Sequence, residues 1–140
     1  MNKKYAYEAF ASLIPEITPV NAPFWDSLHR GEILLQHCTN CHTNQYPAET
    51  FCYQCGSSEL EWQRVEGEGT IYSFTVIHSS RHPAFKDHVP YHVIIIQLDD
   101  GPRMVSALLE AKGAINIGDR VRPVIHRVSD DRSILMFEPV

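Results

Sequence analysis

The sequence predicts a mainly β protein: a short N-terminal helix, a rubredoxin-like zinc ribbon and a C-terminal five-stranded OB-fold barrel. Three observations lead to this fold class. All four cysteines of the chain lie in two C-x-x-C pairs separated by ten residues. A short helix-like segment precedes these pairs, and five β-rich segments separated by turn residues follow them. We expect an N-terminal arm and docking helix over residues 1–36, the zinc ribbon over 37–62 and the OB-fold domain over 63–140.

Length and composition fit one globular domain, or two small modules that share a core. The chain has 140 residues, of which 44% are hydrophobic and 21% charged. Its formal net charge of −5 argues against general binding to polyanions. The longest apolar run, residues 93–96, is far too short to span a membrane. Because the first residues also lack the apolar run of a signal peptide, we expect a cytoplasmic protein without a membrane partner.

The first 31 residues contain one readable helix. Residues 1–22 carry several apolar side chains, but prolines interrupt them. A tail on the surface and a partner-docking arm are both compatible with this pattern. From Pro23, which suits a first helical position, the chain reads as a helix up to the left-handed stop at Gly31. Phe24, Trp25 and Leu28 fall on one side of it. These three residues are our candidates for docking a partner, although such side chains more often pack in a core.

The two C-x-x-C pairs predict a structural metal site. After a strand over residues 32–37, Cys38 and Cys41 form one tight turn, and Cys52 and Cys55 form the second. Two such turns place four sulfurs at the corners of a tetrahedron, which is the geometry of structural zinc. Four thiolates close the coordination sphere, so the ion stabilises the fold and has no open position for a substrate.

Other chemistries fit the same cysteines less well. The C-x-x-C-H pattern that ends at His42 resembles a haem c attachment site, but it leaves the second pair unexplained. A thioredoxin-like site needs a preceding strand and a following helix, and disulfides are disfavoured in a cytosolic setting. A rubredoxin-type iron centre has the same spacing as a zinc site and stays open.

Two positions that follow the cysteine pairs need unusual backbone conformations. Gly56, after Cys55, supplies the freedom that a zinc knuckle requires, and His42 occupies the matching position of the first knuckle. The ten residues between the knuckles, which include Tyr46, Pro47 and Phe51, are expected to form a small hairpin.

The second half of the chain reads as a series of strands. Enrichment in β-branched and aromatic residues, with turn signals between segments, predicts strands over 69–78, 91–98, 103–109, 119–128 and 134–137. Residues 111–118 are expected to contain a crossing segment. Five short strands in this arrangement favour a closed barrel of the OB type, although an open sandwich has the same local pattern.

The loop over residues 79–90 is the main candidate for ligand binding in the barrel. It is long for a hairpin connection, and long loops on rigid barrels often carry function. Arg81 and Lys86 could bind phosphates, and Phe85 could enter an apolar groove. Four histidines lie in or beside this loop without a spacing that indicates a second metal site: His78, His82, His88 and His92.

The order of parts resembles the zinc-ribbon/OB-fold proteins associated with acyl-CoA enzymes, a family long catalogued as a domain of unknown function. The N-terminal part of the resemblance comprises Pro23-Phe24-Trp25, Leu28, Gly31, Leu34-Leu35, the two cysteine pairs, Pro47, Gly56-Ser57 and Leu60-Glu61-Trp62. The C-terminal part comprises residues 69–76, Pro83-Ala84-Phe85, Pro90-Tyr91, residues 98–103, Ile117-Gly118-Asp119 and Val121. The chain departs from the family pattern at His42 and at Ala48-Glu49.

The resemblance implies a non-catalytic accessory subunit of an acyl-CoA-processing complex. Relatives accompany thiolase-fold enzymes or, as a second possibility, hot-dog-fold enoyl-CoA hydratases, so we expect a hetero-oligomer. The barrel would help to form a channel for CoA and its acyl group. Arg81, Lys86 or Arg103 would then contact the phosphates of CoA, and the acyl arm would pass Phe85 and Tyr91.

An alternative function is single-stranded nucleic-acid binding, which OB barrels and zinc ribbons both perform. It would require a basic groove with aromatic platforms. The candidates for that role are Arg120, Arg122, Arg127, Tyr72 and Phe74. The net negative charge makes this the less favoured hypothesis.

Overall fold

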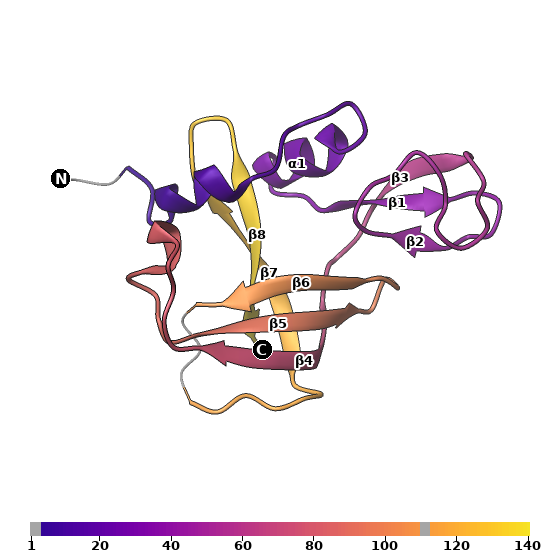
Figure 1. The fold of residues 1–140 in the computed structure, drawn as a ribbon. Coiled ribbons are helices and arrows are strands. Elements are labelled where there is room, and N and C mark those ends of the chain that lie inside the picture. Colours follow the sequence, from indigo (N-terminus) through magenta and orange to yellow (C-terminus); the bar gives the residue numbers. More distant parts are fainter. Residues whose placement is uncertain (1–3, 110–112) are drawn as a thin grey trace.

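The protein is built from two antiparallel sheets and a helical N-terminal segment (Figure 1). The computed structural model describes residues 4–109 and 113–140. A small sheet of β1–β3 forms the ribbon, and a five-stranded sheet of β4–β8 forms the barrel. The predicted mainly β fold class is therefore confirmed.

Two helical elements precede the ribbon. The 3₁₀ helix η1 covers Glu8–Leu13, and the α-helix α1 covers Ala22–His29. Helix α1 starts one residue earlier and ends two residues earlier than the helix that the sequence predicted over 23–31. Gly31, at φ +80°, adopts the left-handed conformation that stops the helix. Ser27 joins α1 to the ribbon, because its hydroxyl donates to Phe24 O at 2.6 Å and accepts from Leu34 N at 3.2 Å.

The ribbon sheet has the order β2-β1-β3, with β1 at Leu34–Cys38, β2 at Asn44–Gln45 and β3 at Leu60–Arg64. The prediction of a hairpin within the residues between the knuckles is wrong. Strand β2 instead forms an antiparallel pair with the preceding strand β1, with Gln45 opposite Gln36, and residues 46–51 form a loop. Sequence patterns missed β3 as a strand, although all five of its residues pair with β1.

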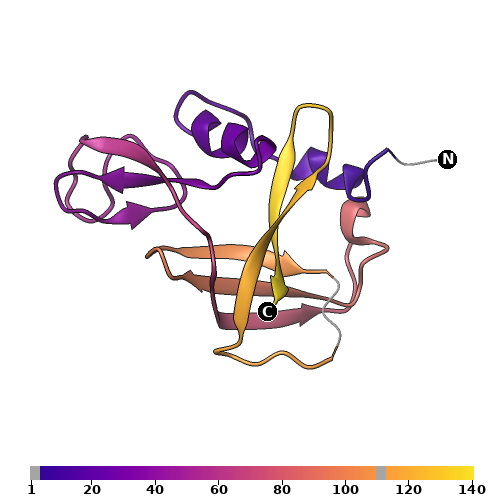
Figure 2. The same cartoon turned by 180° about the vertical axis from the view of Figure 1, so that it is seen from behind.

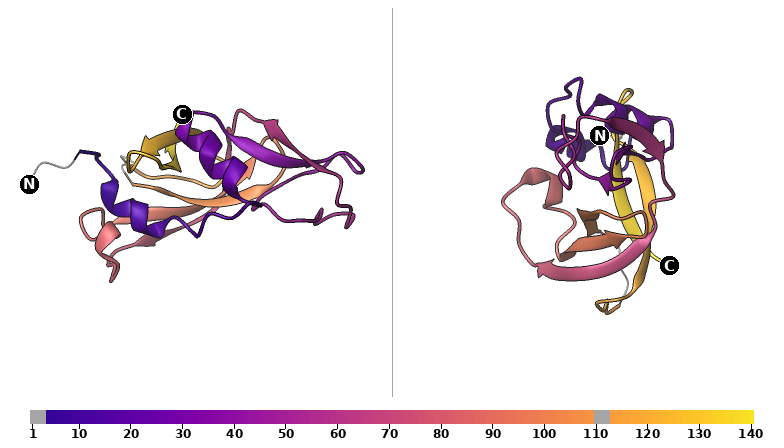
Figure 3. Two further views of the ribbon diagram at one scale, coloured as in Figure 1. Left: turned by 90° about the horizontal axis from the view of Figure 1, so that it is seen from above. Right: turned by 90° about the vertical axis from the view of Figure 1, so that its right-hand side faces the viewer.

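The barrel sheet has the order β6-β5-β4-β7-β8. Its strands are β4 at Gly69–Ile77, β5 at Tyr91–Leu98, β6 at Arg103–Leu108, β7 at Arg120–Arg127 and β8 at Ser133–Pro139. Seen from behind, β7 and β8 run across the direction of β4–β6 (Figure 2). The end-on view shows the strands curving round one interior (Figure 3, right).

The two outer strands of the barrel sheet meet each other. The hydroxyl of Ser106 on β6 donates to the carbonyl of Leu135 on β8 at 3.2 Å. This contact distinguishes the OB barrel from the open sandwich that the sequence pattern also allowed. Of the crossing segment expected over 111–118, residues 111 and 112 lie outside the described residues. Residues 113–118 form an irregular connection with a turn.

One hydrophobic core runs through the ribbon and the barrel. Phe24 and Leu28 of α1 lie in it together with Leu35 of β1, and barrel residues such as Ile71 and Ile96 complete it. A second, smaller core forms where the N-terminal segment lies on the barrel, and Phe10 at its centre is 2% exposed. The described residues of the N-terminal arm are therefore packed against the protein, and their contact with a partner stays a prediction.

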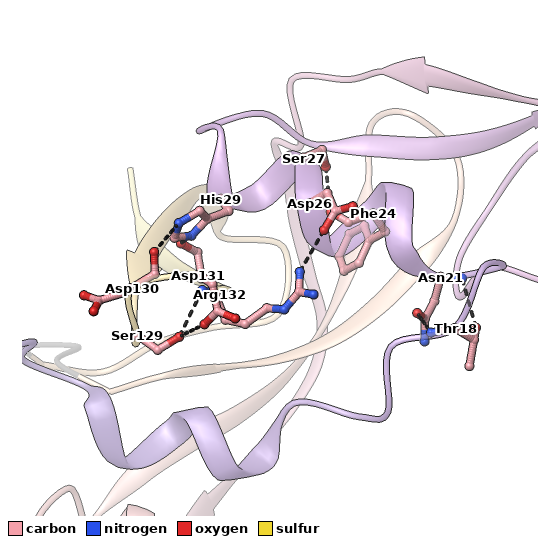
Figure 4. A network of polar contacts seen from close by, with 11 residues as sticks. Thr18, Asn21, Phe24, Asp26, Ser27, His29, Ser129, Asp130, Asp131 and Arg132 are labelled. Atoms are coloured by element: carbon pink, nitrogen blue, oxygen red, sulfur yellow. Dashed lines mark hydrogen bonds and ion pairs between the residues drawn. The ribbon is translucent and has the colours of Figure 1, made fainter.

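A polar network fastens α1 to the loop between β7 and β8 (Figure 4). His29 bonds through one ring nitrogen to Ser133 Oγ and through the other to Asp130 O, both at 3.0 Å. Arg132 forms an ion pair with Asp26 at 2.8 Å. The carboxylate of Asp130 also accepts from Lys4.

In the part of the chain that the structure describes, no helix has the length and apolar character needed to cross a membrane.

Candidate metal centre and apolar groove

The four cysteines converge on one point of the ribbon. Their sulfurs all lie within 4.8 Å of one another. Cys38 Sγ is 3.6 Å from Cys55 Sγ, and Cys41 Sγ is 3.5 Å from Cys52 Sγ. Zinc–sulfur bonds of about 2.3 Å place sulfurs about 3.8 Å apart at the corners of a tetrahedron. The residues therefore fit one structural zinc ion, as the sequence predicted.

Hydrogen bonds to two of the four sulfurs, those of Cys41 and Cys55, favour the thiolate form that binds metal. The hydroxyl of Thr43 lies 3.3 Å from Cys41 Sγ and lowers the pKa of that thiol to about 6. A hydrogen bond from Asn40 Nδ2 at 3.4 Å similarly lowers the pKa of Cys55. Four adjacent sulfurs cannot all ionise without a compensating charge, and a divalent cation supplies it.

The backbone at the two knuckles confirms the sequence reading. Gly56 has φ +77° and His42 has φ +64°, so both positions adopt the left-handed conformation. The amides of these residues donate to Cys52 O and Cys38 O, at 2.9 and 2.8 Å respectively. Among the described residues the four cysteines are the one group placed for metal binding, and none of the four histidines around the 79–90 loop belongs to it.

An apolar groove of about 330 Å³ lies between the N-terminal segment and the outer face of the barrel. Seen from above, η1 and α1 lie in front of the barrel strands (Figure 3, left), and both layers contribute residues to the lining. Aromatic and aliphatic side chains make up nearly all of the lining: Phe10, Leu13, Ile14, Phe24, Trp25, Tyr46, Phe85, Tyr91, Val93, Met104, Val105, Ser106, Ala107, Ile134, Leu135 and Met136.

Two of the predicted CoA-binding residues meet in this groove. The rings of Phe85 and Tyr91 are stacked, with centroids 4.7 Å apart and an interplanar angle of 16°. Phe85 ends the 3₁₀ helix η2, Pro83–Phe85, inside the 79–90 loop. The nitrogen Nδ1 of His82 accepts from Ala84 N at the start of this helix, at 3.1 Å. Burial raises the pKa of Tyr91, so its phenol stays neutral at physiological pH.

The basic residues predicted to contact CoA lie in two places. Arg81 and Lys86 are exposed on the same loop as Phe85. Arg103 lies at the opposite end of the β5–β6 hairpin, where it pairs with Gln97. Its guanidinium stacks on the ring of Tyr72, 3.8 Å from the centroid. Arg81 and Lys86 therefore lie on the loop that supplies Phe85 to the groove, although neither lines it, and Arg103 lies apart from them.

The three candidate docking residues of the helix have different environments. Phe24 is 4% exposed and Leu28 is 1% exposed, so both side chains are occupied by the core of this chain. Trp25 is partly buried and lines the groove. Of the three, it is the residue that retains surface for another molecule.

The residues considered for nucleic-acid binding do not assemble into a basic groove. Arg120 pairs with Asp99 at 2.6 Å, and Arg122 pairs with Glu138 at 2.7 Å. Arg103 stacks on the ring of Tyr72, and Phe74 packs against the core. OB barrels bind oligonucleotides mainly on their second and third strands. Here those strands, β5 and β6, present the apolar groove instead.

Sequence reasoning missed several groove residues, because they come from distant parts of the chain. Leu13, Val105 and Met136 belong to η1, β6 and β8. It also missed Gln36 and Gln45, which are 5% and 4% exposed and bond to each other at 2.9 Å. Side chains of β5 and β6 alternate between the core and the outer face, and Val93 and Val105 lie at outward positions. Apolar residues at these positions were the sequence feature that could have predicted an apolar outer face.

Four converging sulfurs on a small antiparallel ribbon, joined to a five-stranded OB barrel, define a zinc-ribbon/OB-fold protein. Residues 25–61 match the family model of the ChsH2 rubredoxin-like zinc ribbon domain, and residues 62–126 match that of the ChsH2 C-terminal OB-fold domain. The chain belongs to this family, whose members also carry the name DUF35.

Two curated relatives illustrate the range of the family. The chain is 32% identical over 96 residues to a DUF35 domain-containing scaffold protein of Methanothermobacter thermautotrophicus. That match covers 67% of this chain and 71% of the relative. It is 36% identical over 107 residues to a probable enoyl-CoA hydratase alpha subunit of Thermomonospora curvata. That match covers 74% of this chain and 32% of the relative, so the chain spans about a third of the hydratase subunit's length.

A solved structure titled Ltp2-ChsH2(DUF35) aldolase shares the fold. It superimposes with a TM-score of 0.78 at 29% sequence identity. The match covers 90% of this chain and 98% of that one, so both the ribbon and the barrel are included.

Proposed function

We propose that this chain is a non-catalytic accessory subunit of an acyl-CoA-processing complex of the thiolase, aldolase or acyltransferase type. The observation that carries the proposal is the groove of about 330 Å³ on the outer face of the barrel, with its aromatic walls. Pockets of this kind hold apolar ligands, and a few polar groups at the edge orient them. The names of the relatives, a hydratase subunit and an aldolase complex, support an acyl-CoA partner.

The arrangement around the groove suits the two ends of an acyl-CoA. The stacked rings of Phe85 and Tyr91 offer an apolar wall to the pantetheine and acyl arm. Arg81 and Lys86, exposed within five residues of Phe85, can bind phosphate through charge-assisted hydrogen bonds. Arg103 would reach only a ligand that extends along the hairpin to its far end.

The partner enzyme would supply the catalytic groups. In this chain, four sulfurs complete the coordination of the zinc, so the metal stabilises the ribbon and offers no site for substrate. We infer a thiolase-fold enzyme as the first candidate partner and a hot-dog-fold enoyl-CoA hydratase as the second. The aldolase title favours the first of these two, and the hydratase name favours the second.

The proposal is tested by purifying the tagged chain from its native host and identifying the enzymes that elute with it by mass spectrometry. The expected result is one acyl-CoA enzyme in fixed stoichiometry, whose turnover depends on this chain. Turnover of acyl-CoA by the isolated chain, or elution without any acyl-CoA enzyme, would contradict the proposal.

Removal of the zinc is expected to release the partner. In the Cys38→Ser, Cys41→Ser double variant two sulfur ligands are lost, so the ribbon should lose its metal and its fixed conformation. Zinc content by elemental analysis and partner retention should fall together, and Thr39→Ser in the same knuckle should change neither. Retention of the partner by a zinc-free variant would show that the ribbon is not required for assembly.

A further inference from the structure

The loop after β2 continues into the second zinc knuckle, and this segment, residues 46–53 (the 46–53 loop), exposes two neighbouring aromatic rings. Phe51 is 46% exposed and Tyr53 is 50% exposed. The two rings stand edge to face, with centroids 6.0 Å apart. The proposed acyl groove contains neither of them. Exposed aromatic side chains that gather at one place are typical of the energetically dominant residues of protein interfaces.

Two buried glutamines hold this loop in one conformation. Gln36 donates to Glu49 O at 2.8 Å and accepts from Glu49 N at 2.9 Å. Gln45 donates to Phe51 O at 3.0 Å and accepts from Tyr53 N at 2.9 Å. Burial of two polar side chains is costly unless both are fully hydrogen-bonded, and here their bonds order a loop that exposes apolar rings. A loop ordered in advance loses less entropy when it binds.

The hydroxyl of Tyr53 adds a further restraint, because it donates to Pro47 O at 2.8 Å. Beside the ring lies a notch of about 130 Å³, whose walls include Tyr46, Tyr53 and Pro102. A notch of this size can receive one side chain of a partner. A cation placed there would lie beside two tyrosine side chains, and the faces of such rings attract positive charge.

The ribbon is acidic over residues 37–62, and its one Lys or Arg residue is Arg64, at the end of β3. Residues 37–62 include three glutamates, Glu49, Glu59 and Glu61, but none of the 12 Lys and Arg residues of the chain. A zinc ion with four thiolate ligands adds two further negative charges. A second copy of this chain would meet the surface with the same sign of charge, and so would a nucleic acid. Charge complementarity therefore favours a basic protein surface.

We propose that the 46–53 loop docks on the acyl-CoA enzyme, at a face where Lys and Arg side chains surround an apolar recess for Phe51 and Tyr53. This inference rests on the proposed function and specifies the surface through which the complex would form. In this complex the two aromatic rings provide most of the binding affinity. The glutamates increase the association rate and orient the two proteins as they approach.

The aromatic half is tested with the purified acyl-CoA enzyme that the wild-type chain retains. The Phe51→Ser, Tyr53→Ser double variant should raise the dissociation constant by about 30-fold or more, as expected for two interface anchors. Ile117→Ser is the matched control, because Ile117 is 69% exposed and lies outside the ribbon. It should change the dissociation constant less than about twofold. Zinc content should be unchanged in both variants, which shows that the metal site is intact.

The electrostatic half is tested by charge reversal. Glu49→Lys should lower the association rate about tenfold at low salt, and the difference should shrink in 0.5 M salt, where surface charges are screened. Glu66→Lys, at an exposed position outside the ribbon, is the control. Faster association of Glu49→Lys would overturn the assignment of a basic partner face.

The outcomes separate this inference from the proposed function. If the wild-type chain retains no acyl-CoA enzyme, both are wrong. If the enzyme is retained and binds the Phe51→Ser, Tyr53→Ser variant as tightly as the wild type, the accessory function stands and only the docking surface is overturned.

Discussion

Gln36 is the residue on which the order of the 46–53 loop depends most. Its side-chain amide bonds to both backbone groups of Glu49 and to the side chain of Gln45. Side chains of this length rarely lie in a core unless every polar atom is paired. In the described structure no buried side-chain nitrogen or oxygen lacks a partner.

The substitution Gln36→Leu is expected to destabilise the zinc-loaded protein by about 2–3 kcal/mol. It removes the partners of both backbone groups of Glu49, which are partly buried, and of one side-chain N–H of Gln45. A fully buried loss costs about 1–3 kcal/mol, and water replaces part of the bonding at Glu49, so the total stays below the sum. Chemical denaturation of the variant measures the change. The control is Gln63→Leu, at an exposed position of β3, which should change stability by less than about 0.5 kcal/mol.

The positive φ of His42 predicts how substitutions at this residue change the melting temperature. A residue with a Cβ in the left-handed region carries a conformational cost of about 1–2 kcal/mol, and glycine avoids it. His42→Gly should therefore melt at the same temperature as the wild type or slightly above it. His42→Val should melt below it, because branching at Cβ is least tolerated there. Equal melting of the two variants would show that the conformation of this knuckle relaxes at no cost.

At the scale of elements, Arg120 joins the ends of three barrel strands. It lies at the start of β7 and binds Asp99, just after β5, through two bonds of 2.8 and 2.6 Å. It also approaches Glu68, just before β4, at 3.5 Å. The hydrogen bond from Arg120 holds the pKa of Asp99 below its ordinary value.

The sign of this pKa shift determines the pH dependence of the pair. A lowered pKa means that the folded state favours the charged carboxylate. The stabilisation is therefore complete above the ordinary pKa of about 3.9 and is lost only on further acidification. A double-mutant cycle with Asp99→Asn and Arg120→Gln should give a small favourable coupling, because the pair is exposed. The coupling should be equal at about pH 7 and about pH 5, and weaker in high salt. A fall between these two pH values would contradict the assignment.

Local sequence patterns predicted the strands of the barrel but not all of the ribbon. Residues 91–98 alternate and are followed by Asp99-Asp100-Gly101, so β5 agrees with the prediction at both ends. By contrast, β3 is short, lies half in solvent and is defined by pairing with β1, more than 20 residues away. The ten residues between the knuckles were predicted to form a hairpin, but residues 46–51 form a loop whose order comes from the side chains of two glutamines on β1 and β2. Patterns of neighbouring residues do not report such long-range bonds.

The two candidate sites differ in how far the sequence could predict them. The metal centre is local, because the spacing within each cysteine pair almost dictates the knuckle, and all four predicted ligands converge. The groove needs six elements to come together before it exists: η1, α1, η2, β5, β6 and β8. Residue type pointed to Phe85 and Tyr91, but the contributions of Leu13, Val105 and Met136 depend on how η1 and β8 lie on the barrel.

At the scale of the whole molecule, the groove can be obstructed without disturbing the core. Val105 lines the groove and is 65% exposed, so Val105→Trp should fill space in its mouth with little strain. The assembled complex should then lose about tenfold or more of its kcat/KM for long-chain acyl-CoA and keep its activity on acetyl-CoA. Val76→Trp, on β4 and outside the groove, is the control. Equal activity of Val105→Trp on both substrates would show that the acyl chain does not pass here.

The core that the ribbon shares with the barrel constrains how the protein can change over time. Ile33, just before β1, is 4% exposed, and its carbonyl accepts from Val65 N, just after β3, at 2.9 Å. Its methyl Cδ1 also lies so close to Gly67 that even a Cβ at Gly67 would be only 2.6 Å away. A recombination event that exchanged one half for that of a distant homologue would bring together surfaces never selected for each other. The two halves are therefore expected to be inherited as a unit, and substitutions at Ile33 and Gly67 to occur in compensating pairs.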